Sequence, residues 1–370
     1  MSSSGCASTQ GTENYRRRFR NVAADNYFRE AQGLWFSSIG IGTYLGNASA
    51  ETDRAYRDAI VRAVELGANV IDTAANYRFQ RSERSVGAAI AELERRGLGR
   101  DEMTVCTKGG YIPFDGEPPR DVRHYIEENF IETGIAGWGD IAAGVHCMTP
   151  RYLDNQLRQS LSNLKLDCVD VYYVHNPESQ LSAVSHDEFW RRVRAAFEFL
   201  EQSVSDGRIE YYGVATWNGF REEPDSRGYH SLETMVELAR ATAGDDHHFR
   251  FIQLPVNLTM PEALFFQNQK LGDEYVSVVE AADKFGVTVM ASGSLMQGQV
   301  AHGLPESIRQ TLGSLATDAQ TGIQFVRSSP GITTALVGMS KIAHVEENLA
   351  LANVDPVSPD ALLGVYDHEE

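Results

Sequence analysis

An acid, a phenol, an amine and an imidazole stand at, or just after, the ends of three short apolar runs in this chain. Asp72, Lys108 and His175 each end a run rich in β-branched residues, and Tyr77 follows five residues after Asp72. If the runs are neighbouring strands of one parallel barrel, their carboxyl ends meet at one mouth, where active sites of such barrels lie. The four side chains would then converge, and together they could deliver a proton to a carbonyl oxygen.

The chemistry follows from what each group does to the next. A tyrosine hydroxyl has an ordinary pKa near ~10 and is a poor proton donor at neutral pH. The ammonium group of Lys108 would stabilise the phenolate of Tyr77 and lower that pKa, and Asp72 would orient Lys108 and keep it protonated. His175 could hydrogen-bond the substrate oxygen, which completes a general acid aimed at a developing alkoxide. No side chain donates a hydride, so this arrangement implies a nicotinamide cofactor.

Each of these residues also has a plain structural interpretation. Asp72 could cap the turn after its strand, and Tyr77 could be an ordinary half-buried aromatic residue. Lys108 could be a solvated strand end, and His175 could be a histidine whose hydrogen bonds are satisfied locally. The joint occurrence of all four near the ends of consecutive strands favours the catalytic interpretation.

Strand-like and helix-like segments alternate along the chain. Strands are predicted at residues 38–43, 69–72, 103–107, 169–174, 209–215, 249–254, 287–291 and 333–337. Helices are predicted at residues 53–66, 82–96, 150–164, 188–205, 231–243, 274–285, 316–328 and 341–351. Alternation of this kind implies a parallel sheet with crossover helices, and eight pairs favour a closed (β/α)8 TIM barrel. The first strand is not followed by a GxGxxG motif, which argues against a Rossmann dinucleotide site.

The predicted barrel occupies residues 34–355, between an N-terminal tail, 1–33, and a C-terminal tail, 356–370. Residues 109–149, after the third strand, form an insertion longer than ordinary βα loops and are expected to lie over the catalytic face. Residues 216–230 form a second long loop after the fifth strand. A purely structural or oligomerisation role for these loops stays open.

The acidic balance of the chain limits its partners. The formal net charge of the 370 residues is −18, which argues against nonspecific binding to nucleic acid or to an anionic membrane. No run is long and apolar enough to span a bilayer.

Cys106 and Cys168 lie in or beside apolar runs and are expected to be packed thiols. A reducing cytoplasm fits this cysteine usage best.

Several motifs along the chain resemble those of the aldo-keto reductase family. They are residues 67–77 with 82–90, Thr107-Lys108, Val174-His175, residues 206–214, Gln253 with Asn257, and Val337-Gly338 with residues 344–348. Together they extend from about residue 39 to residue 351, which is nearly the whole chain apart from the tails and the insertion.

This resemblance implies an NAD(P)H-dependent enzyme that reduces an aldehyde or ketone, with NADP, or NAD, as cofactor. It implies that Asp72, Tyr77, Lys108 and His175 form a catalytic tetrad in which Tyr77 is the general acid. The residues that would hold the cofactor are Gly42, Thr43, Tyr44, Asp72, Thr216, Gln253, Ser292, Leu295, Gly338, Ser340, His344, Glu347 and Asn348. The walls of the substrate pocket are expected from Tyr44, Tyr111, His175 and Trp217.

Several positions depart from the family pattern. Ala215-Thr216 stands where a Ser-Asn pair is common, and Ser292 stands where an aromatic residue often stacks on the nicotinamide. Gly338 and His344 replace basic residues that many NADP-preferring members carry, which weakens the expected site for a 2′-phosphate. The turn between Tyr77 and residues 82–83 is two residues longer than in the shortest family pattern.

Two other functions are compatible with the sequence. The chain could be a cofactor-binding regulatory or interaction subunit with little turnover. It could also be a barrel lyase or isomerase that uses Lys108 as a Schiff-base amine, although an ion pair with Asp72 would keep that amine protonated and unreactive.

No metal site is predicted, because His124, His146 and Cys147 lack regular ligand spacing. The physiological substrate and the oligomeric state are not encoded in any motif.

Overall fold

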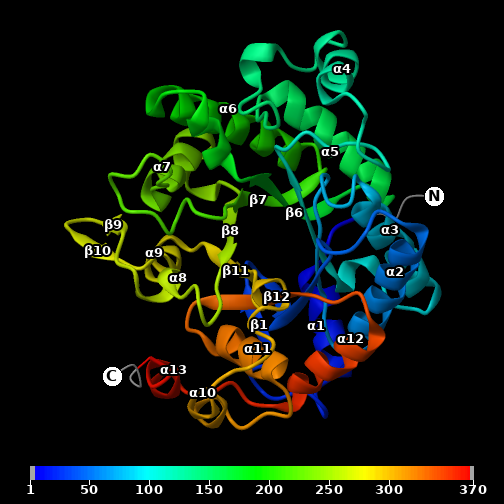
Figure 1. The fold of residues 1–370 in the computed structure, drawn as a ribbon, viewed down its shortest axis with the longest axis vertical. Coiled ribbons are helices and arrows are strands. Elements are labelled where there is room, and N and C mark those ends of the chain that lie inside the picture. Colours follow the sequence, from blue (N-terminus) through cyan, green and yellow to red (C-terminus); the bar gives the residue numbers. More distant parts are fainter. Residues whose placement is uncertain (1–4, 367–370) are drawn as a thin grey trace.

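Eight parallel strands close into a barrel in the computed structural model, which describes residues 5–366 (Figure 1). The strands pair in the order β11-β12-β3-β4-β5-β6-β7-β8. Their bounds are β3 Ile39–Gly42, β4 Val70–Asp72, β5 Thr104–Gly109, β6 Val169–His175, β7 Ile209–Ala215, β8 Phe249–Pro255, β11 Thr288–Ser292 and β12 Ile332–Gly338. The predicted (β/α)8 barrel is confirmed.

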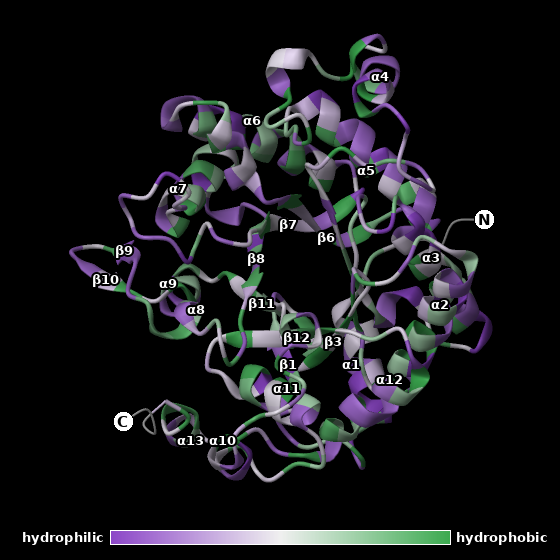
Figure 2. Cartoon of the chain, viewed as in Figure 1, coloured by the Kyte–Doolittle hydropathy of each residue, from purple (hydrophilic) through white to green (hydrophobic). Residues whose placement is uncertain are grey.

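A helix follows each barrel strand, and all but the last return the chain to the next strand. These helices are α2 Ala50–Glu65, α3 Arg81–Arg95, α5 Pro150–Leu164, α6 His186–Ser205, α7 Leu232–Ala243, α9 Val278–Phe285, α11 Asp318–Ser328 and α12 Ile342–Leu349. In α2, Ala59, Ile60, Ala63 and Val64 are fully buried at helical spacing, so one stripe of the helix covers the barrel. Figure 2 shows the resulting mixture of hydrophobic and hydrophilic residues along the outer helices.

Shorter elements decorate this frame. They are α1 Thr9–Arg18, β1 Phe28–Ala31, β2 Leu34–Ser37, α4 Val122–Ile126, α8 Glu262–Phe265, β9 Gln269–Leu271, β10 Glu274–Val276, α10 Glu306–Thr311 and α13 Pro359–Leu363. In the insertion, α4 is followed by a π-helix, Glu127–Ile131, and by a 3-10 turn, Trp138–Asp140. The strand β10 occupies the start of the segment predicted as helix 274–285, so that prediction is wrong for its first residues. The cause is a hairpin with β9, a nonlocal pairing that helical periodicity does not reveal.

The period-two geometry of a strand decides which residues face the inside of the barrel. Val171 and Tyr173 of β6 and Cys106 of β5 pack inside with residues of the other strands. Two residues further along these strands, the same alternation turns His175 and Lys108 toward the interior, at the carboxyl end of the barrel. The sequence thereby places polar groups as the last layer above an apolar core.

The N-terminal tail predicted at residues 1–33 packs on the barrel in the part that the structure describes, residues 5–33. Tyr15 on α1 and Tyr27 are fully buried, and the hairpin of β1 and β2 carries Phe36 into the base of the barrel, against Phe251. The open amino-terminal end of the barrel exposes an apolar layer that must be covered. The N-terminal segment supplies that cover. Leu362 of α13 is buried as well, so the C-terminal segment is also partly packed.

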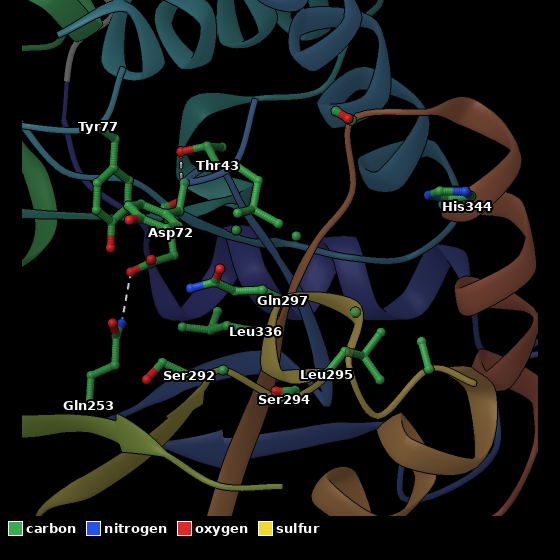
Figure 3. Close-up of a pocket in the computed structure, with 18 of the residues that line it drawn as sticks. Thr43, Asp72, Tyr77, Gln253, Ser292, Ser294, Leu295, Gln297, Leu336 and His344 are labelled. Atoms are coloured by element: carbon green, nitrogen blue, oxygen red, sulfur yellow. Dashed lines mark hydrogen bonds between the residues drawn. The ribbon is translucent and has the colours of Figure 1, made fainter. Parts of the chain in front are cut away.

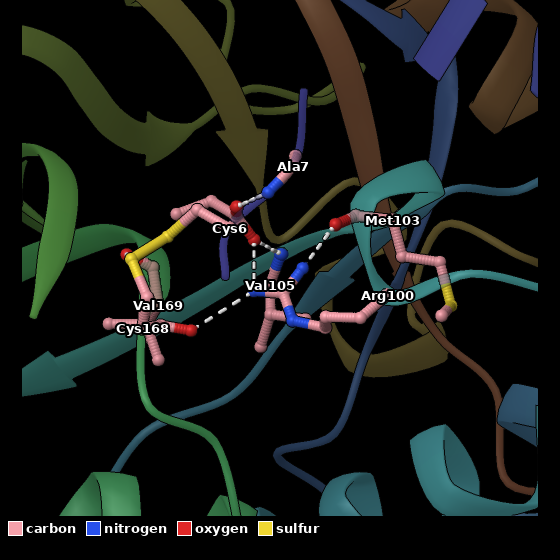
Figure 4. Close-up of a disulfide and its surroundings, with 8 residues drawn as sticks. Cys6, Ala7, Arg100, Met103, Val105, Cys168 and Val169 are labelled. Atoms are coloured by element: carbon pink, nitrogen blue, oxygen red, sulfur yellow. Dashed lines mark hydrogen bonds and ion pairs between the residues drawn. A yellow bond between two sulfur atoms is a disulfide. The ribbon is translucent and has the colours of Figure 1, made fainter. Parts of the chain in front are cut away.

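Cys168 is not the packed thiol expected from the sequence. It forms a disulfide with Cys6 that joins the N-terminal segment to the residue before β6 (Figure 4). Beside it, the buried carboxylate of Asp170 accepts hydrogen bonds from the Ala7 amide and pairs with Arg100 at 2.7 Å. Cys106 and Cys147 are free and buried. The cytoplasmic location stays a prediction, and this disulfide is at odds with it because reducing compartments keep such pairs open.

We expect Cys6→Ser to lower the free energy of unfolding by about 2–4 kcal/mol under oxidising conditions, because the bond closes a long loop of the unfolded chain. Chemical denaturation followed by circular dichroism measures the change. The wild-type protein in a reducing agent is the matched control and should behave like the variant. Equal stability of the oxidised and reduced wild-type protein would contradict this role for the bond.

Among residues 5–366, no helix has both the length and the apolar character needed to cross a membrane.

Candidate active site

One cavity of about 910 Å³ opens at the carboxyl end of the barrel strands (Figure 3). Every residue predicted for the catalytic, cofactor and substrate sites lines it, with the exception of Lys108. No lysine or arginine is among the described residues of its wall. Figure 3 shows Tyr77 and Asp72 at one end and His344 at the other, with Leu295 and Gln297 between them.

Lys108 lies beneath the floor of the cavity in a buried ion pair with Asp72. Its Nζ is 2.6 and 2.8 Å from the two carboxylate oxygens and donates a third hydrogen bond to the Thr73 carbonyl at 2.9 Å. Burial is the largest single effect and lowers the pKa of Lys108, but the charge of Asp72, the nearby Tyr77 and the hydrogen bond to Asp72 together raise it above its ordinary value. Gln253 donates to the same carboxylate at 2.8 Å, which fixes it from the other side.

Tyr77 lies over this pair. The Lys108 ammonium is 5.0 Å from the centre of the Tyr77 ring. Desolvation raises the pKa of Tyr77, while the charge of Lys108 lowers it, and the net result is a pKa above the ordinary value. The sequence argument anticipated the effect of Lys108 but not the larger effect of burial. The hydroxyl therefore keeps its proton at neutral pH, as a proton donor must.

The turn after Tyr77 is strained. Arg78, Phe79 and Gln80 are three successive residues with positive φ, of 46°, 58° and 67°, although L-residues disfavour this region. Buried contacts hold them there: Arg78 bonds Asp53 at 2.7 Å, and Asn163 donates to the Gln80 side chain at 3.0 Å. This turn lies in the segment that is longer than the family pattern, and it fixes the entry of the chain into α3.

His175 faces Tyr77 across the end of the cavity. The two ring centroids are 5.9 Å apart in an edge-on arrangement, and Tyr111 of the insertion packs edge-on against His175 at 5.1 Å. Desolvation, aided by the charge of Lys108, holds the pKa of His175 well below its ordinary value. The imidazole is therefore neutral near pH 7, with one N–H to donate.

The loop with Trp217 is held by a half-buried carboxylate, that of Glu178. Glu178 accepts hydrogen bonds from the Thr216 hydroxyl at 2.7 Å and from the Trp217 amide at 3.0 Å. Although desolvation raises the pKa of Glu178, His230 and these donors lower it to about 2. Thr216 was predicted to bind the cofactor, but in this structure its hydroxyl proton is committed to Glu178.

The far end of the cavity lies against α12. The Glu347 carboxylate accepts from the Thr317 hydroxyl at 2.7 Å. Asn348 is buried, and its Oδ1 is without a hydrogen-bond partner among the described residues. His344, Ser340 and Gly338 complete this end of the wall.

Sequence reasoning missed part of the wall. The missed residues are Leu45, Tyr56, Asn76, Asn176, Gly293, Ser294, Gln297, Gly298, Ala301, His302, Thr317, Asp318, Ala319 and Leu336. Many of them come from the loop after β11, which contains α10. The length of that loop, at the carboxyl end of a barrel strand, was the signal that could have found them.

The model of the Aldo/keto reductase family matches residues 38–222, which carry Asp72, Tyr77, Lys108 and His175. The chain belongs to the aldo/keto reductase family. The matched range begins beside β3 and ends within the loop after β7, so it contains the first five strands of the barrel in chain order.

Relatives of this aldo/keto reductase are distant but cover nearly its whole length. It is 24% identical over 355 residues to "Putative voltage-gated potassium channel subunit beta" of Schizosaccharomyces pombe, with 90% of each chain covered. It is 22% identical over 344 residues to "Uncharacterized oxidoreductase YqkF" of Bacillus subtilis, covering 90% of this chain and 93% of that one. Its fold matches that of an aldo/keto reductase from Klebsiella pneumoniae in complex with NADP and acetate, with a TM-score of 0.61 and 21% identity. The match covers 92% of this chain and 94% of the Klebsiella chain.

Proposed function

We propose that this aldo/keto reductase uses NADP(H), or NAD(H), to reduce an aldehyde or ketone to an alcohol. The observation that carries the proposal is the junction of Tyr77, His175 and the buried Asp72–Lys108 pair at one end of a long cavity. Family membership and the NADP complex of the Klebsiella enzyme support it.

The residues of the cavity fit a dinucleotide. The unpartnered Oδ1 of Asn348 is an acceptor that a bound adenine amine would satisfy. Glu347 and Ser340 add polar groups at the same end, while Thr43 and Tyr44 border the end beside Tyr77. When bound, the nicotinamide supplies the hydride that no side chain can give.

The side chains then have separate tasks. The neutral His175 imidazole donates a hydrogen bond to the carbonyl oxygen and sets its angle. As hydride reaches the carbonyl carbon, the Tyr77 hydroxyl gives its proton to the oxygen, and the C=O double bond becomes a C–O–H group. Lys108 stabilises the phenolate left on Tyr77, and Asp72 keeps Lys108 protonated and in place. The oxidative reaction runs through the same groups in reverse.

The substrate end has aromatic walls. Tyr44 and Trp217 keep 54% and 41% of their surface exposed, although both border the cavity. Exposed rings offer flat apolar faces on which a ring-bearing compound, an extended apolar chain or a sugar can stack.

The direct test is a titration of the purified protein with NADPH and with NADH, followed by loss of reduced-nicotinamide absorbance against a panel of aldehydes and ketones. We expect cofactor binding and turnover of at least one carbonyl class. Binding without turnover of any member of the panel would overturn the enzymatic proposal.

A second candidate is a cofactor-binding regulatory or interaction subunit. The name of the S. pombe relative favours this function, since it describes a channel subunit. Cofactor binding without turnover is the result expected for this function.

The lack of lysine and arginine among the described residues of the cavity wall leads to a prediction about His344. We expect His344→Arg to tighten NADPH binding by about tenfold or more, because a guanidinium can form charge-assisted hydrogen bonds with a phosphate. NADH, which lacks the 2′-phosphate, is the control and should bind both proteins equally. Fluorescence titration gives both dissociation constants, and equal gains for the two cofactors would contradict the assignment.

A further inference from the structure

The insertion reaches back to the strand end that carries His175. His146, near the end of the insertion, is fully buried, and its Nε2 lies 2.7 Å from the carbonyl oxygen of His175. Its other ring nitrogen, Nδ1, lies 2.8 Å from the side-chain nitrogen of Gln180. From its sequence position His146 was weighed only as a metal ligand, because it lies beside Cys147.

The partners of Gln180 determine where the His146 proton is. The Arg192 guanidinium can only donate, and its Nη1 lies 2.5 Å from Gln180 Oε1, which fixes the orientation of the amide. The amide nitrogen of Gln180 therefore faces His146 and donates to Nδ1. The proton of the neutral ring is then on Nε2, which donates to the His175 carbonyl. Burial lowers the pKa of His146 to about 4, so this arrangement persists at neutral pH.

The chain of hydrogen bonds ends at Arg192, which joins Gln180 to both α6 and the insertion. Arg192, on α6, also donates to the carbonyl oxygens of Gly139 and Asp140 in the insertion, at 3.1 and 3.3 Å, and pairs with Glu188 at 2.8 Å. The insertion has its own apolar cluster, to which Tyr152 of α5 contributes. The position of His146 is thus set by both the insertion and the barrel.

The backbone leaves little room for another arrangement. Gly110 has φ of 140°, and a Cβ at that position would lie 2.7 Å from His146 Nε2 and 3.0 Å from the His175 carbonyl oxygen. Tyr111 packs edge-on against the rings of both histidines, at 5.2 and 5.1 Å. Its hydroxyl accepts a hydrogen bond from Asn176, the residue after His175, at 3.1 Å.

His175 depends on this support because its own ring has few anchors. Its Nδ1 is buried and without a hydrogen-bond partner among the described residues. A ring without a second polar anchor takes its direction from its backbone and from the side chains packed on it. The hydrogen bond from His146 holds that backbone at the carbonyl, and Tyr111 holds the ring.

We propose that His146 is a positioning residue, which fixes the main chain of His175 so that its imidazole meets the substrate oxygen at the right angle. This inference rests on the proposed function, because it assigns His146 to the same reaction. It gives the insertion a role in catalysis that the length of the loop alone does not reveal.

Two amide substitutions separate the two contacts of His146. In His146→Gln the side-chain nitrogen can take the place of Nε2 and donate to the His175 carbonyl. In His146→Asn the shorter amide reaches only the place of Nδ1, beside Gln180. We expect His146→Asn to lower kcat by about 10- to 100-fold, since small displacements of reacting groups have effects of this size. We expect His146→Gln to retain most of the wild-type kcat.

The dissociation constant of the cofactor and the melting temperature are measured for both variants. A purely structural role would lower the melting temperature without separating kcat in the two variants. The proposal is overturned if His146→Asn keeps the wild-type kcat, or if His146→Gln loses as much kcat as His146→Asn.

Nuclear magnetic resonance of the ¹⁵N-labelled imidazole of His175 provides a readout that does not need turnover. A shifted or broadened His175 signal in His146→Asn, with a wild-type signal in His146→Gln, is expected even if no carbonyl is reduced. Absence of turnover in the wild-type protein would therefore refute the proposed function, whereas identical His175 signals in all three proteins would refute the positioning role.

Discussion

Tyr77→Phe should reduce carbonyl turnover by about 100- to 10,000-fold, the range in which a positioned general acid contributes. The substitution removes only the hydroxyl, and the ring keeps its edge-on contacts with Tyr44 and His175. Cofactor affinity and the melting temperature should therefore change little. Steady-state kinetics with a responsive carbonyl, together with cofactor titration, measure both effects.

A matched control is available at the other end of the barrel. The Tyr211 hydroxyl hydrogen-bonds the Gln32 carbonyl at 3.1 Å, far along β7 from the cavity. Tyr211→Phe should leave turnover unchanged. Wild-type turnover in Tyr77→Phe would remove Tyr77 from the mechanism and with it the assignment of the cavity as an oxidoreductase site.

Lys108→Met should have the second large effect, and it should act on stability as well as on turnover. The side chains of Lys108 and Asp72 are only 1% and 7% exposed. Removing one partner of a buried pair leaves an uncompensated charge and costs about 3–5 kcal/mol. Turnover should fall because the phenolate of Tyr77 loses its counter-charge.

The pH range in which Lys108 stabilises the folded protein follows from its raised pKa. A raised pKa in the folded state contributes stability that is fully present below the ordinary value of 10.5 and is lost only as the pH rises through the folded pKa. The stabilisation that the Lys108 charge gives the wild-type protein should therefore be constant across the neutral range. Denaturant unfolding at several pH values measures it.

The double variant Asp72→Asn with Lys108→Met separates stability from chemistry. Removing the second charge should restore part of the lost stability, because no unpaired ion stays buried. Turnover should not recover. A Lys108→Met protein as stable as the wild type would show that the ion pair is not a buried structural element.

Much of this fold was predictable because the periodicities are regular. The strands β4 and β6 end on Asp72 and His175, β5 ends one residue after Lys108, and the helices carry clear apolar stripes. The direction of each strand-end side chain then follows from alternation alone. For that reason Asp72, Tyr77, Lys108 and His175 were expected at one end of the barrel, and the structure brings them together there.

What was missed depends on contacts between distant residues. The disulfide between Cys6 and Cys168 joins positions 162 residues apart, and no spacing rule pairs them. The contact of His146 with the His175 carbonyl is equally nonlocal. Burial also decided the direction in which the pKa of Tyr77 is shifted. The extent to which a side chain is buried depends on the whole wall around it rather than on its sequence neighbours.

The Cys6–Cys168 link also constrains the order in which the barrel can be completed. A chain is synthesised from its amino terminus, so Cys6 must wait until the residue before β6 has been made. By then the strands β3, β4 and β5, with Asp72 and Lys108, have already been made within the loop that the link closes. Only noncovalent contacts can hold that first part of the barrel until the sulfur atoms meet.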